Sequence, residues 1–112
     1  MTLLRLIETT PGQYSLLLDA GTTPVDGVIG ELGHEPNGYF WAGVAEVLVR
    51  TEAPALKGRF AYDPEAGMFC AYGTDRGALQ ELEALMNAVA TEGERIRRLV
   101  ADAEARGFEF DD

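Results

Sequence analysis

The amino-acid sequence predicts a single α+β domain in which an antiparallel sheet of two hairpins carries three to four helices packed on one face. Two stretches alternate apolar and polar residues on either side of a short turn, which is the pattern of a β-hairpin. Three others repeat apolar residues at intervals of three and four, as an amphipathic helix does. The chain has 112 residues, which fits one domain over 1–112 and is too short for two ordinary ones.

The first hairpin is expected over residues 2–8 and 13–19. Leu4 and Leu6 share one face of the first strand, because successive strand residues point to opposite sides of a sheet. The turn between the strands contains Gly12, and glycine accepts a positive φ at no steric cost. The turn residue and the alternating pattern therefore both predict a hairpin here.

Residues 20–37 are rich in glycine, and two structures stay open for them. Thr23, which precedes a proline, would cap a short helix over residues 25–32. Two interior glycines oppose that helix, each by about 1 kcal/mol relative to alanine. The alternative is an irregular loop exposed to solvent.

The segment 38–51 is a clearer helix, because Trp41, Val44 and Leu48 recur at helical spacing. Pro54 prevents its continuation. A second hairpin follows over residues 58–63 and 67–73. In this hairpin, the alternation places Phe60 and Tyr62 on one strand opposite Met68, Cys70 and Tyr72 on the other.

Two further helices are expected before the C-terminus. Thr74 or Asp75 caps the third, and residues 91–94 match a capping box that starts the fourth. Gly107 ends that helix. Phe108 and Phe110 then form either a short last strand at the sheet edge or a plug against the core.

The charge of the chain is strongly acidic, with 19 acids against 9 bases and a formal net charge of -10. Such a chain repels nucleic acid and anionic membranes, and it attracts basic partners. Solubility alone would also explain the acidity. However, no Lys or Arg lies between Arg5 and Arg50, whereas several acids do. This segregation favours a negative face for a positive partner.

Cys70 is the only cysteine, so no intramolecular disulfide can form. This favours a reducing cytoplasm, and no apolar run approaches the roughly 20 residues that span a bilayer. We therefore expect a cytoplasmic, unanchored protein. Because its neighbours are apolar, Cys70 is expected to be a buried structural residue and not a nucleophile.

The evidence for chemistry in the sequence is weak, and we expect no catalytic residue, metal or cofactor. Ser15 is the only serine, and the glycines match no phosphate-binding motif. One alternative stays open, a small metal- or acid/base-dependent enzyme that uses the four residues His34, Glu35, Asp63 and Glu65. It requires the loop 31–37 and the turn 63–67 to meet in space.

Three blocks of the sequence resemble the Immunity protein 51 family: GYFWAGVA at 38–45, YDPEAGMFCAYG at 62–73 and GFEF at 107–110. The members of this family are bacterial proteins encoded beside polymorphic toxins. The resemblance implies binding and neutralisation of a cognate toxin, without catalysis. It identifies neither the toxin nor the contact residues. An acidic adaptor domain with a non-toxin partner remains the other alternative.

The candidate partner-binding residues therefore come from charge and loop position. They are expected to contact a toxin with a basic surface, and Tyr39 is the candidate aromatic anchor. The full set is Asp19, Asp26, Glu31, His34, Glu35, Tyr39, Asp63 and Glu65.

Overall fold

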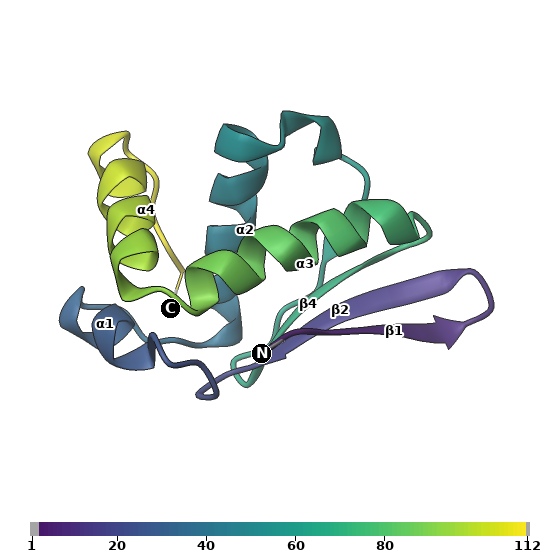
Figure 1. The fold of residues 1–112 in the computed structure, drawn as a ribbon, viewed down its shortest axis with the longest axis horizontal. Helices are drawn as coiled ribbons and strands as arrows, with labels where there is room; N and C mark the ends of the chain where they lie inside the picture. The colour runs from purple at the N-terminus through teal and green to yellow at the C-terminus, as the bar shows by residue number, and fades with distance from the viewer. Residues whose placement is uncertain (1–2, 112) are drawn as a thin grey trace.

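The structure, a computed structural model, describes residues 3–111 and confirms the α+β fold class (Figure 1). Its antiparallel sheet has the strand order β1-β2-β4-β3. The strands are β1 (Arg5–Thr10), β2 (Gln13–Asp19), β3 (Ala61–Tyr62) and β4 (Met68–Gly73). The helices are α1 (Asp26–Glu31), α2 (Gly38–Glu52), α3 (Arg76–Ala90) and α4 (Gly93–Ala105), with a 3₁₀ turn η1 (Pro54–Leu56).

The two hairpins join through the pairing of β2 with β4, which runs from Tyr14 opposite Gly73 to Asp19 opposite Met68. Cross-strand partners point to the same face of a sheet. Leu16 and Leu18 therefore share a face with Ala71 and Phe69, and all four are buried. Helices α2 and α3 pack on this face and close the core.

The prediction that Cys70 is buried was wrong, and Tyr62 pairs with the buried Ala71, not with Cys70. Cys70 is only half-buried and Tyr72 is exposed, because both point away from the helices. Every residue from 68 to 72 is apolar or aromatic, so the alternation within this strand is ambiguous by itself. The register with β2 resolves it, since Cys70 pairs with Leu17 and not with the core residue Leu16.

Several element boundaries also differ from those expected. The predicted start of the first strand at residue 2 lies outside the described residues, and β1 begins at Arg5. The predicted strand 58–63 shrinks to Ala61–Tyr62. No strand forms at residues 108–110; instead Phe110 is 7% exposed and packs 5.2 Å from Phe40 between ring centroids. The plug is therefore the alternative that occurs.

Two of the predicted helix caps are wrong. The Thr23 hydroxyl donates to the carboxylate of Asp26, and no side chain caps α1. Thr91 ends α3, where its hydroxyl donates to the Asn87 carbonyl at 2.9 Å, so it does not cap α4. Asp75 does cap α3, accepting a 3.0 Å bond from the amide of Ala78.

The N-terminus of α2 is held against the connector between β3 and β4. Asn37 caps the helix by accepting a bond from the Phe40 amide at 2.9 Å. The amide of Gly38 donates to the carbonyl of Ala66 at 3.1 Å. A Cβ atom on Gly38 would overlap the carbonyl oxygens of Glu65 and Met68. Only glycine therefore allows this close approach of the two backbones.

We predict that Gly38→Ala lowers the free energy of unfolding by about 1–3 kcal/mol, because the added methyl group forces the helix and the connector apart. Gly30→Ala is the matched control, since nothing lies within 4 Å of a Cβ at that helical position. The control should be neutral or slightly stabilising. Urea denaturation measures both, and equal stability of the two variants would contradict the close contact.

Candidate functional site

The turn formed by residues 63–67 separates two surfaces of the molecule. The Asp63 amide donates to the Cys70 carbonyl at 2.9 Å, and Glu65 and Met68 exchange bonds of 2.8 and 3.1 Å. This regular pairing points Asp63 and Glu65 to the sheet face that the helices leave uncovered. Pro64 instead lines a groove on the helical side.

The register of the strands puts the following residues on the open sheet face: Arg5, Ile7, Ser15, Leu17, Asp19, Met68, Cys70 and Tyr72. Ile7 and Tyr72 flank Ser15 in the sheet, and they are 42% and 44% exposed. With Tyr39 they are the large hydrophobic side chains that stay exposed within the described residues. Exposed apolar side chains gathered on one face are typical of a surface that binds another protein.

Carboxylates gather at one end of the open sheet face. Asp19 and Glu65 lie on either side of Met68, and Asp63 lies opposite Cys70. Arg5 pairs with Asp19 at 3.2 Å. Burial raises the pKa of the Cys70 thiol, and so do the negative charges of Asp63 and Glu65, against a hydrogen bond from Ser15. The thiol therefore stays protonated, unlike that of a catalytic cysteine.

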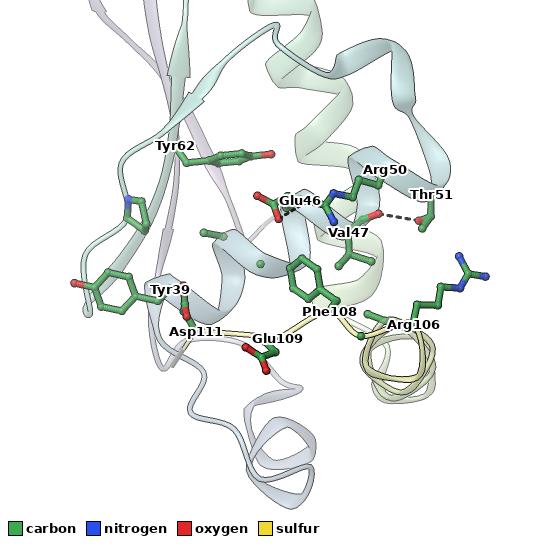
Figure 2. A pocket seen from close by; sticks show the side chains of 15 residues that line it. Tyr39, Glu46, Val47, Arg50, Thr51, Tyr62, Arg106, Phe108, Glu109 and Asp111 are labelled. Atoms are coloured by element: carbon green, nitrogen blue, oxygen red, sulfur yellow. Dashed lines mark hydrogen bonds and ion pairs between the residues drawn. The ribbon is translucent and has the colours of Figure 1, made fainter.

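The second surface is a groove of about 660 Å³ between α2, the 63–67 turn and the C-terminal tail. We call it the tyrosine groove, after Tyr39 and Tyr62 on its walls. Figure 2 shows Tyr62 above Glu46 and Arg50 and Phe108 of the tail below them, with Tyr39 at the left edge and its hydroxyl pointing away from the other labelled side chains. Glu46 and Arg50 rise from α2 between Tyr62 and Phe108.

A chain of contacts fixes the interior of the tyrosine groove. Arg50 binds Glu46 one helical turn away at 3.2 Å, and its guanidinium lies 5.5 Å over the centre of the Phe108 ring. Burial, and then the charge of Glu46, raises the pKa of Tyr62 to about 12. The Tyr62 phenol is therefore neutral at physiological pH.

Glu109 and Asp111 of the tail also line the tyrosine groove (Figure 2). These two acids, with Glu46, Tyr62 and Phe108, were missing from the residues predicted for the site. The alternation of aromatic and acidic residues at 108–111 was the available signal. It predicts rings turned inward and carboxylates turned outward.

The predicted acidic stretch does not form one unpaired negative face. Arg5 reaches Asp19, and Arg97 of α4 reaches Glu31 at 3.6 Å. Asp26 accepts the bond from Thr23. Glu35 is exposed in the loop before α2. Of the eight predicted residues, the structure places Asp19, Asp63 and Glu65 together on the open sheet face and Tyr39 in the tyrosine groove.

His34 is turned toward the C-terminal half of the chain. Its Nε2 lies 3.0 Å from Glu104, and its ring packs against Phe40 and Phe110. The backbone does approach the turn 63–67 directly after the loop 31–37, at the bond from Gly38 to Ala66. Even so, no group of three or more His, Cys, Asp or Glu side chains suited to a metal occurs within residues 3–111.

None of the helices in the described part of the chain is long and apolar enough to cross a membrane. Among protein families, the model described as Immunity protein 51 matches residues 4–105. No match is found among curated proteins or among solved structures. The family match includes the open sheet face and the 63–67 turn, and it ends before Glu109 and Asp111.

We predict that the free energy of unfolding falls as pH rises through the range from 10 to 12. The folded chain keeps the proton of Tyr62 to a pKa of about 12, whereas an unfolded tyrosine releases it near 10.0. Tyr62→Phe should remove this part of the pH dependence, and Glu46→Gln should reduce it. Denaturant titration at several pH values measures the effect, and an unchanged dependence in Tyr62→Phe would contradict it.

Proposed function

The chain belongs to the Immunity protein 51 family, and from that membership we propose that it binds a cognate bacterial toxin and neutralises it by covering the toxin's active surface. The proposal assigns the chain a binding role and no catalysis. The observation that carries it is the open sheet face, whose apolar side chains are exposed or half-buried and whose end is acidic.

The shape of the open sheet face supports a protein as the partner. An antiparallel sheet packed on one side offers a broad surface, whereas small ligands bind in concave pockets. Apolar and aromatic residues at the centre with charges at the rim are the usual composition of a protein interface. Leu17 and Tyr72 supply the centre on β2 and β4, Ile7 extends it onto the edge strand β1, and Asp19, Asp63 and Glu65 supply the rim.

Charge supports a basic partner. The net charge of -10 attracts a positive protein at long range, and the acidic end orients it on arrival. A toxin that acts on nucleic acid presents a basic cleft for the phosphates. Such a cleft would be complementary to the acidic end of the open sheet face, and covering it would stop the toxin.

Protection of living cells tests the proposal directly. The toxin gene next to the gene for this chain would be expressed under tight control, alone and together with the chain. We expect growth only in the presence of the chain, and a complex of the two proteins that survives gel filtration. Continued killing with the chain in excess would refute the assignment to that toxin.

We predict that the triple variant Asp19→Lys, Asp63→Lys and Glu65→Lys associates with the toxin at least about tenfold more slowly at low salt, because it reverses the steering charge. The matched control reverses Glu81, Glu83 and Glu92, which lie on α3 and before α4. It changes the net charge equally and should slow association far less. Surface plasmon resonance over a salt series measures both, and equal slowing would mean that position does not matter.

A further inference from the structure

The tyrosine groove is a second surface that the open sheet face does not explain. Its volume of about 660 Å³ would hold a large side chain with its neighbouring backbone. Tyr39 stays 42% exposed at its edge, and tyrosine is a residue that is enriched at interfaces. Aromatic walls around an open hollow suit a ligand that presents a flat or cationic group.

The charges of the tyrosine groove favour a cation. Glu46, Glu109 and Asp111 line it. Glu46 is already paired with Arg50, whereas Glu109 and Asp111 form no ion pair within residues 3–111. Arg106, the other base of the lining, points away from the groove in Figure 2. An anionic ligand would meet these unpaired carboxylates.

The groove already contains one arginine side chain of the protein itself, which shows the kind of group that its lining can hold. The Arg50 guanidinium is held between a carboxylate, that of Glu46, and an aromatic ring, that of Phe108. The same two kinds of group recur beside it as Glu109 and Asp111 with the rings of Tyr39 and Tyr62. A neutral Tyr62 also keeps its hydroxyl as a hydrogen-bond donor and acceptor.

We propose that the tyrosine groove receives an arginine side chain that projects from the toxin, with its guanidinium stacked on the ring of Tyr62 and bonded to Glu109 and Asp111. Arginine fits better than lysine, because its planar group stacks on rings and binds carboxylates through two parallel bonds. The identity of the partner rests on the proposed function, whereas the chemistry of the groove can be tested without any toxin.

The probe is a blocked tri-arginine peptide, followed by two-dimensional NMR of the full chain. We expect saturable shifts of the amide resonances of Tyr39, Gly43 and Phe108, which line the groove. Tri-lysine should bind at least about threefold more weakly, and tri-glutamate should cause no saturable shift. Shifts that map to the open sheet face, or equal binding of tri-lysine, would overturn the proposal.

Matched variants separate the groove from the general acidity of the chain. Glu109→Gln with Asp111→Asn should weaken tri-arginine binding at least about fivefold. Glu81→Gln with Glu83→Gln removes the same charge from α3 and should change it less than about twofold. Equal weakening by the two pairs would overturn the proposal. Cell protection reports on toxin neutralisation separately. A failure to protect would remove the toxin as the source of the arginine but not the arginine binding of the groove, and a failure of tri-arginine binding would leave neutralisation untouched.

Discussion

The close contact between Gly38 and the connector of the second hairpin is the constraint on which the rest of the structure depends. It lets the first turn of α2 lie directly on backbone carbonyls, without any side chain between them. Phe40 and Trp41 then enter the core, while Tyr39 faces outward beside the 63–67 turn. One backbone contact therefore joins the core to both candidate binding surfaces.

Much of the fold follows from the periodicity of the sequence, and its failures have physical causes. Both hairpins and the three long helices occur near their predicted positions, although the strand expected over 58–63 is reduced to Ala61–Tyr62. The face of Cys70 could not be predicted, because the whole of β4 is apolar or aromatic and only its register with β2 selects the buried side. Thr91 was wrongly predicted to cap α4, because its hydroxyl donates to the carbonyl of Asn87 in the preceding helix.

The candidate site was predictable only where the contributing residues are close in sequence or paired across strands. Asp63 and Glu65 flank Pro64, and the pairing of β2 with β4 brings Asp19 to them. The acidic stretch between Arg5 and Arg50 contains no base of its own, but Arg97 of α4 forms an ion pair with Glu31. No local pattern reveals such a pair. The proposed toxin would therefore contact both sides of the 63–67 turn.

Hydrogen exchange of the chain alone and in complex with its toxin tests that account most directly. The amides of residues 61–67 lie in and before the turn, between the open sheet face and the tyrosine groove. Those of residues 107–111 belong to the tail that forms one wall of the groove. The account predicts slower exchange in both segments on binding, and no change over residues 20–31. Protection over 20–31 with none over 61–67 would contradict it and place the toxin on the α1 side of the molecule.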